Sequence, residues 1–399
     1  MSSKRVYLDH AATTAVHPEV IETLTNAVKE YWGNASSFYE EGHHSAHALD
    51  AARKTVADTL NAKAEEIYFT SCGSESDNWA IKGAAFAHKN KGKHIISSKI
   101  EHHAVLHSLD WLEKQGFEIE YLDVDENGLV SPEQLKNALR EDTILVSIMM
   151  ANNEVGSIQP IKELAAICKE NKTLFHTDAV QAFGAIPIDV ADLGVDLLSV
   201  SGHKLYAPKG IGALYIRKTV KIENLIHGGA QERRKRAGTE NLPYIIAFAK
   251  AVELAMRDME ENTEKLREMQ SYMIENLLKK IPHSKLNGHP EKRLPNNVNI
   301  SFEFIEGEGI LLMLDALGYS CSSGSACTSA SLDASHVLLA MGMPHEISHG
   351  SLRISLGREN TMEDIKEFVE ALPPVIEKLR MMSPLWEQFQ KGEIEALIP

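Results

Sequence analysis

Short apolar runs alternate with amphipathic stretches between residues 66 and 216. Stretches such as 75–90 and 161–171 repeat apolar residues at helical spacing. The runs between them have the length and the branched or aromatic content of buried strands, and they cover residues 66–70, 93–98, 117–124, 143–150, 173–178 and 196–201. This alternation predicts an α/β fold in which helices cover both faces of a mostly parallel sheet.

The rest of the chain has a mixed pattern with more helix than strand. Two helices are expected before the block, at 16–31 and 44–62, and a long one after it, at 240–281, bent or broken near Pro243. The last part combines the strands 297–302 and 351–356 with helices around 308–317, 334–341 and 361–380. Asp333 is expected to cap the helix near 334, and Gly342 to end it.

A chain of 399 residues is longer than one hydrophobic core usually fills. We therefore expect two domains. The large domain would comprise residues 16–260. The small domain would comprise residues 1–15 and 261–399, including a loop at about 321–333 that is expected to be mobile.

Composition narrows the class of protein. The content of 43% hydrophobic and 24% charged residues is ordinary for a globular protein. The net charge of −15 argues against nucleic-acid binding, and the one dense basic run, RRKR at 233–236, is typical of a solvated loop. No apolar run approaches the roughly 18 residues of a membrane span, and the N-terminus lacks a signal-peptide pattern. We expect a cytoplasmic protein that binds neither membranes nor nucleic acid.

The four cysteines, at positions 72, 168, 321 and 327, lack the spacing of a metal site. In a reducing compartment they would be free thiols, so neither a disulfide framework nor an intrinsic metal is expected. Cys327 lies in the turn-prone segment CSSGSACTS, and a role as a nucleophile stays open for it. Cys321 follows an apolar segment and is interpreted as a packed thiol.

Two strand ends could hold a charged ligand. The segment TSCGSESDN follows a strand and opens a helix, so that Gly73 allows close approach of a ligand and Ser74 could help to hold an anion. A serine-capped helix start explains this segment equally well. Asp178 follows another strand and is either a helix cap or a charge directed at a ligand cation.

A third strand end is followed by a lysine, whose amine could react with a ligand. Lys204 shares a tight turn with Ser201 and His203, where it could attack a carbonyl group, although most such lysines are simply at the surface. Ligands of parallel sheets bind beyond the carboxyl ends of the strands. An anion site, a carboxylate and a lysine at this edge are together the groups that hold pyridoxal phosphate in proteins.

The sequence resembles the NifS/IscS-type cysteine desulfurases, pyridoxal-phosphate enzymes of the aspartate-aminotransferase fold (fold type I). The similarity runs through nearly the whole chain, in YLDHAATT, GSESDN, EHHAV, NNEVGSIQP, HTDAVQ, SGHKLYAPKG, AGTENLP, SSGSACTSAS and LRISLGR. The cysteine segment is similar to that of the long-loop group. The resemblance implies a seven-stranded, mostly parallel sheet in the large domain, a small α+β domain and a homodimer.

The resemblance also implies a role for each matching residue. Lys204 would form the Schiff base with the cofactor and move protons at the substrate α-carbon. His102 would stack on the cofactor ring and take part in proton transfer. Asp178 would pair with the ring nitrogen and Gln181 with the phenolic oxygen.

The phosphate would be held by Gly73, Ser74, Ser201 and His203, and by Thr239 of the second subunit. Asn153 and Arg353 would bind the substrate carboxylate, and Asn153 would also line the cofactor site.

In this scheme Cys327 attacks the sulfur of L-cysteine, which yields L-alanine and a Cys327 persulfide. An iron–sulfur scaffold protein or another acceptor, for example in tRNA thiolation or nitrogenase maturation, would then take the sulfur. Cys327 would be an iron–sulfur ligand only together with such a scaffold. The alternatives are a selenocysteine lyase or another C–S lyase on the same scaffold, and a non-catalytic metal-binding protein.

Two positions depart from the family pattern. Cys72 stands where a glycine is expected before the phosphate-binding turn, which questions the backbone geometry there. Ala35 replaces a common proline. In the C-terminal tail, Trp386 and Phe389 either contact the acceptor or fold back onto the small domain.

Overall fold

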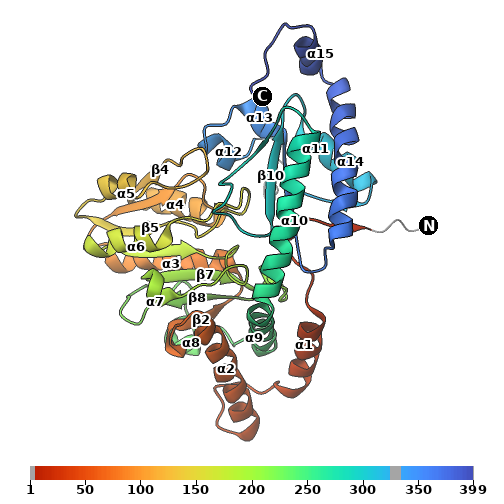
Figure 1. Cartoon of the computed structure of the whole chain (residues 1–399). Coiled ribbons are helices and arrows are strands. Elements are labelled where there is room, and N and C mark those ends of the chain that lie inside the picture. The colour runs from red at the N-terminus through yellow and green to blue at the C-terminus, as the bar shows by residue number, and fades with distance from the viewer. Residues whose placement is uncertain (1–4, 324–333, 399) are drawn as a thin grey trace.

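The computed structural model describes residues 5–323 and 334–398. The larger of the two parts of the molecule is built on one twisted sheet (Figure 1). The sheet has seven strands in the order β2-β8-β7-β6-β5-β3-β4. Their bounds are β2 Ile67–Thr70, β3 His94–Ser98, β4 Glu118–Leu122, β5 Thr143–Ser147, β6 Leu174–Asp178, β7 Leu197–Ser201 and β8 Gly212–Ile216. Only β8 runs antiparallel to its neighbours in this sheet, so the expected mostly parallel sheet is confirmed.

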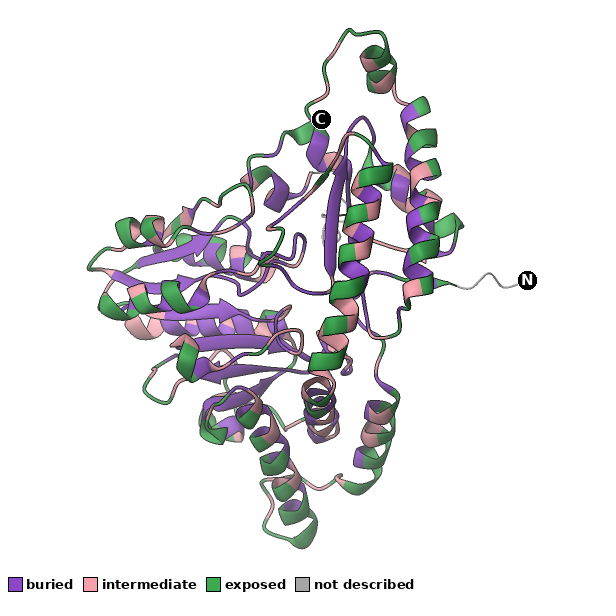
Figure 2. Cartoon of the chain, viewed as in Figure 1, coloured by how far each residue is buried: buried purple, intermediate pink, exposed green. Residues whose placement is uncertain are grey.

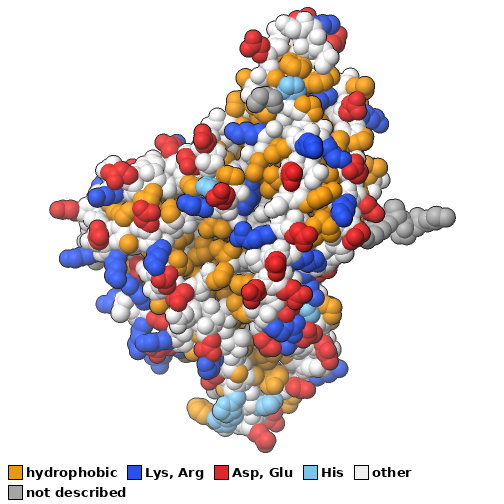
Figure 3. All heavy atoms as spheres, viewed as in Figure 1, with side chains coloured by type: hydrophobic (Ala, Val, Ile, Leu, Met, Phe, Trp, Pro, Cys, Tyr) orange, Lys and Arg blue, Asp and Glu red, His pale blue; other side chains and the backbone are white. Residues whose placement is uncertain are grey.

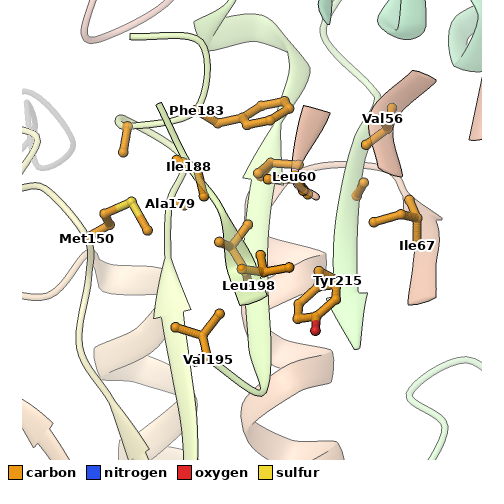
Figure 4. Close-up of a cluster of buried hydrophobic side chains, with 14 of the residues drawn as sticks. Val56, Leu60, Ile67, Met150, Ala179, Phe183, Ile188, Val195, Leu198 and Tyr215 are labelled. Atoms are coloured by element: carbon orange, nitrogen blue, oxygen red, sulfur yellow. The ribbon is translucent and has the colours of Figure 1, made fainter. Parts of the chain in front are cut away.

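Helices cover both faces of this sheet because successive strand residues point to opposite sides. Ile95, Leu145 and Leu197 pack with α3 (Gly73–His88) and α4 (His103–Lys114). The residues that follow each of them in the chain, including Val146 and Leu198, pack in a second core on the other face. That core includes residues of α2 (Glu40–Thr59), α5 (Pro132–Ala138), α6 (Ile161–Glu170), α7 (Val190–Leu193) and α9 (Leu242–Arg257). Figure 4 shows part of it, with Leu198 and Tyr215 of the sheet beside Val56 and Leu60.

The smaller part has a hydrophobic core of its own. A three-stranded sheet, in the order β12-β10-β9, packs with three helices, and a two-stranded sheet pairs β1 with β11. The bounds are β1 Val6–Tyr7, β9 Ser284–Leu286, β10 Asn297–Phe302, β11 Tyr319–Ser320, β12 Ser351–Ser355, α10 Met259–Lys280, α11 Gly307–Ala316 and α14 Met362–Met381. Figure 2 shows β10 as a fully buried strand behind α10. We propose the domain boundary at the junction of α9 and α10.

The remaining elements are short or peripheral. They are α1 Pro18–Glu30, α8 Gln231–Arg234, α12 His336–Ala340, α13 His345–His349, α15 Pro384–Gln390 and the 3₁₀ turns Ala64–Glu66 and Gly202–Lys204. No helix within the ranges described is both long and apolar enough to cross a membrane.

The long helical pattern at 240–281 breaks at a different place from the one expected. Pro243 lies in the first turn of α9, where a missing N–H costs nothing, and the chain breaks between α9 and α10 at Asp258. The helix after the cysteine segment also begins later than expected. Its N-cap is Ser335, whose hydroxyl accepts a hydrogen bond from Leu338 N, while Asp333 lies outside the described residues.

The aromatic residues of the C-terminal tail fold back onto the small domain. The Phe389 ring stacks on Phe304 at a centroid distance of 4.9 Å, and Trp386 lies 5.4 Å from the same ring. The His283 ring contacts both. The tail rings are therefore used in packing within the chain.

Candidate active site

A cavity of about 370 Å³ opens at the carboxyl ends of the strands. Because β8 runs opposite to β2 and β7, β2 ends at the same edge as the parallel strands. Ten of the residues expected from the sequence line this cavity: Gly73, Ser74, His102, Asn153, Asp178, Gln181, Ser201, His203, Lys204 and Arg353. Thr239 is exposed and is not in its wall, and Cys327 lies outside the described residues.

The turn before α3 is shaped to admit an anion. A Cβ atom on Gly73 would lie 2.8 Å from a Val180 methyl carbon, so a larger residue would force Val180 to move. The Ser201 Oγ atom is buried and has no hydrogen-bond partner in the part of the chain described. Together with the N–H groups at the start of a 16-residue helix, this hydroxyl provides donors for a phosphate.

Cys72 does not disturb this turn. Its φ of −174° and ψ of 172° are extended values that any residue adopts. The departure from the expected glycine therefore imposes no strain on the backbone.

Lys204 ends the 3₁₀ turn that follows β7. Its Nζ atom donates to the carbonyl oxygens of Ala11 and Ala12, at 2.6 and 2.7 Å. Gln181 Nε2 donates to the same Ala11 oxygen at 3.0 Å. The N-terminal segment thus holds the amine inside the cavity. These carbonyl contacts could not be predicted from sequence beyond the presence of the motif YLDHAATT.

Asp178 lies at the end of β6 and is 5% exposed. Its Oδ1 atom accepts a hydrogen bond from Val180 N at 2.8 Å. Burial raises the pKa of Asp178 to about 6, although the positive charge of Lys204 opposes this shift. The carboxyl group is therefore ready to ionise fully when a second cationic group approaches.

Asp77 is a second buried carboxyl in the same cavity, and sequence reasoning missed it. It lies on α3, 1% exposed, with Oδ1 at 3.6 Å from His176 Nε2. Burial and the charge of Asp178 raise the pKa of Asp77 well above its usual value. The available signal was a charged residue beside the buried run Trp79–Ile81 on an apolar helix face.

His102 is the N-cap of α4, and its Nδ1 atom accepts a hydrogen bond from Ala104 N at 3.1 Å. Burial and the charge of Lys204 lower the pKa of His102 to about 4. The imidazole is thus neutral at physiological pH, and because Nδ1 is the acceptor, its proton lies on Nε2.

Glu101 is buried next to His102 and was also missed. Its Oε1 atom accepts hydrogen bonds from Ser98 Oγ at 2.5 Å and Met149 N at 3.0 Å. Burial raises the pKa of Glu101 to about 8 in spite of these bonds. The side chain fixes the loop after β3 to the segment after β5.

Arg353 enters the cavity from β12 of the small domain. Its Nη2 atom donates to Asp9 Oδ1 at 2.9 Å, and its Nη1 atom donates to the Asn153 carbonyl at 3.2 Å. The Nε atom is buried and makes no hydrogen bond to the described residues. A guanidinium held in this way can bind a carboxylate, and the contact to Asn153 involves the backbone of that residue.

The three described cysteines are free thiols. Cys321 packs at the margin of the small-domain core, and burial followed by the charge of Asp9 raises the pKa of its thiol. Its packed position agrees with the sequence interpretation. No cluster of potential metal ligands occurs among residues 5–323 and 334–398.

Comparison with known proteins gives the class of this fold and site. The model of the class-V aminotransferases matches residues 6–368. A protein of Methanosarcina thermophila described as cysteine desulfurase IscS is 60% identical over 96% of this chain and 95% of its own length. The solved structure of a NifS-like protein superposes with a TM-score of 0.88, at 39% identity, covering 94% of this chain and all of that one.

A further solved structure, described as SspA in complex with cysteine, has a TM-score of 0.79 and 37% identity, and the alignment covers 88% of this chain and 98% of that chain. The chain therefore belongs to the class-V aminotransferase family. Within that family its relatives are cysteine desulfurases of the NifS/IscS type. The expected family, fold class and enzyme class are confirmed.

Replacement of Glu101 by Gln is expected to change the pH dependence of stability. The folded protein binds the Glu101 proton more tightly than the unfolded chain, whose glutamate pKa is about 4.5. The free energy of unfolding of the wild type should therefore fall as pH rises from about 4.5 to 8, by up to ~1.4 kcal/mol per pH unit from this group.

Urea unfolding at several pH values across this window measures the effect, and Glu101→Gln should remove that part of the slope. Glu65→Gln is the matched control, because Glu65 is exposed and hydrogen bonding to Lys218 lowers its pKa, below the window. Parallel curves for the wild type and Glu101→Gln would contradict the prediction.

Proposed function

We propose that this chain removes sulfur from L-cysteine with pyridoxal phosphate as cofactor, releases L-alanine and leaves a persulfide on Cys327. The observation that supports this proposal most directly is the convergence of Lys204, Asp178, His102 and the anion-binding turn in one cavity, with Arg353 at its side. These groups come from separate strand ends, and no structural requirement of the sheet explains why all of them are polar.

The residues fit the cofactor. The unpartnered Ser201 hydroxyl and the start of α3, where Gly73 and Ser74 lie, would hold the phosphate. Asp178 would pair with the ring nitrogen, which would return its raised pKa toward the ionised state. When bound, pyridoxal phosphate supplies an electron sink for the bonds at the substrate α-carbon.

Lys204 and His102 would take part in proton transfer. Lys204 would hold the cofactor covalently and then move the proton at the substrate α-carbon, and its two backbone acceptors orient the amine for both roles. His102, neutral because of burial, would stack on the ring and take part in proton transfer. Gln181 and His203 complete the contacts expected for the cofactor.

The substrate would be oriented by its carboxylate. Arg353 is fixed by Asp9 and by the Asn153 backbone and keeps a buried Nε donor for a ligand. SspA, a structural relative, is described in complex with cysteine, which supports cysteine as the substrate here.

Sulfur transfer would take place at Cys327. Its thiolate would attack the substrate sulfur, and the S–S bond would form as the substrate C–S bond breaks. The electron pair of that bond would return to the substrate carbon, which takes up a proton to give alanine. Cys321 is a poor candidate for this step because burial raises its pKa and keeps it a thiol.

A homodimer would complete the site. Large apolar side chains are exposed around α1 and the start of α2: Trp32 is 70% and Phe38 94% exposed. Hydrophobic and histidine side chains gather at this lower end of the molecule (Figure 3). Exposed aromatic groups of this size are typical of an interface. By the family resemblance, Thr239 of the second copy would bind the phosphate.

The persulfide sulfur would pass to an iron–sulfur scaffold protein or another acceptor in the cytoplasm. The free thiols of the described cysteines fit a reducing compartment.

Lys204→Ala should abolish the bond that borohydride fixes between protein and cofactor, because among the described residues Lys204 is the one lysine that lines the cavity. Mass spectrometry of the borohydride-treated protein measures the label. Lys209→Ala, which changes an exposed lysine of the same segment, should keep it. A label on another lysine of the wild type would refute the assignment.

Cys327→Ser should bind cysteine and cofactor yet release alanine at least on the order of a hundredfold more slowly, since its hydroxyl is a poor nucleophile toward sulfur. Cys321→Ser is the control, and it should retain activity at a cost of about 1 kcal/mol in stability. Alanine release and the sulfur added to the 327 peptide are the measurements. Wild-type alanine release by Cys327→Ser would show the mechanism to be wrong.

Phe38→Asp should shift the protein toward a monomer with weakened cofactor binding, because it places a charge in the expected interface. Leu312→Asp is the control, since Leu312 is 73% exposed on α11 of the small domain. Sedimentation and cofactor titration measure both effects. A fully active monomer would exclude the shared site.

A further inference from the structure

The basic segment expected to be a solvated loop is bound to the edge of the large sheet. Edge strands leave backbone groups without partners. On the edge strand β2, Phe69 N donates to Glu232 Oε2 at 3.0 Å, and the Ile67 carbonyl accepts from Arg53 at 2.8 Å and from Arg233 at 2.5 Å. Side chains of the loop therefore cover the strand that leads into the phosphate-binding turn.

A buried ion pair fixes this loop. Arg53 Nη1 and Nη2 donate to the two carboxylate oxygens of Glu232 at 2.7 and 2.8 Å, and both side chains are almost fully buried. Glu232, Arg233 and Arg234 have φ values of 43°, 56° and 65°. Three successive non-glycine residues in this region cost roughly 1 kcal/mol or more each, so the contacts impose the path of the loop.

A second ion pair connects the loop with the cofactor turn. Arg236 Nε and Nη2 donate to the two carboxylate oxygens of Glu75 at 2.8 and 3.1 Å. Glu75 follows Ser74 in the first turn of α3 and also accepts from Ser71 N at 2.8 Å. Burial would raise the pKa of Glu75, but its bonds to Arg236 and Ser71 outweigh this and lower it, so the carboxylate is ionised.

Thr239 follows Arg236 by three residues at the exposed end of the same loop. Between them, Gly238 adopts a φ of +104° and its N–H donates to Gln231 Oε1 at 3.1 Å, which closes the loop on itself. Thr239 is thus presented to solvent from a segment that is anchored at Glu232 and at Arg236.

We propose that Glu75 and Arg236 are positioning residues that link the two cofactor-phosphate sites of the dimer. This pair, which we call the clamp, holds the turn Ser71–Ser74 of its own protomer and sets the position of Thr239, which serves the partner protomer. The inference rests on the proposed function, because it assumes the shared cofactor site. A change in the clamp of one protomer is transmitted to the site of the other.

Hybrid dimers with two affinity tags test this transmission. In the first hybrid, one protomer has both Glu75→Gln and Lys204→Ala, and the other is wild type. The borohydride-labelled site then lies in the wild-type protomer and receives Thr239 from the altered loop. In the second hybrid the two substitutions are in different protomers, so the labelled site has the altered turn and an intact Thr239 loop.

The measurement is cofactor affinity during reconstitution of the cofactor-free hybrids, relative to a reference hybrid that has only Lys204→Ala in one protomer. The first hybrid should bind cofactor about fivefold more weakly or worse, in the range of ordinary coupling between sites. Reference affinity in the first hybrid, whether or not the second is weakened, would overturn the proposal.

Two controls separate the clamp from general damage. Asp142→Asn breaks a similar two-bond pair with Arg140 on an exposed surface. A first hybrid that has Asp142→Asn instead of Glu75→Gln should bind cofactor with the affinity of the reference hybrid. Arg236→Lys keeps the charge but loses the paired geometry, and in the first hybrid it should give an intermediate loss. A reference hybrid that fixes no cofactor would overturn the proposed function itself.

Discussion

The alignment of strands β2, β5, β6 and β7 is the constraint on which the site depends, because all of them end at one edge of the sheet. The residues that follow these strand ends therefore lie close together in one cavity. Two buried carboxyl groups, of Asp77 and Asp178, then lie in a cavity with one ammonium group, that of Lys204. Low solvation makes each charge dependent on the others, so the protonation state of one group sets that of its neighbours.

The N-terminal segment connects this site with the small domain. Asp9 pairs with Arg353 of β12, and the carbonyls of Ala11 and Ala12 bind Lys204, so a segment of four residues contacts two of the side chains that line the cavity. A movement of the small domain that shifts Arg353 would therefore also shift the carbonyl groups that bind Lys204. The same few residues would orient the substrate carboxylate and the amine that reacts near it.

Much of the fold and most of the site could be predicted from sequence, because they depend on local patterns. The strands follow from apolar runs, and Lys204 and Asp178 from their positions after those runs. Asp77, Glu101 and Asp9 were missed, since each acquires its role from partners distant in sequence. The segment at 233–236 is only partly the solvated loop that its charge predicts: Arg233 and Arg234 are exposed, yet the segment is also held by specific contacts. Its contacts with Ile67 and Glu75 depend on how the sheet edge folds, and charge alone does not reveal that.

The Arg53–Glu232 pair has a consequence for the exchange of parts between related chains. Loss of either partner leaves a charge buried without compensation, which typically costs 3–5 kcal/mol. The loop that contains Glu232 therefore cannot be transplanted without the arginine of α2, which lies 179 positions away in sequence. Substitutions at Arg53 and Glu232 must therefore occur together in evolution. A recombination breakpoint between the two positions would give a chimera with a disrupted sheet edge beside its cofactor turn.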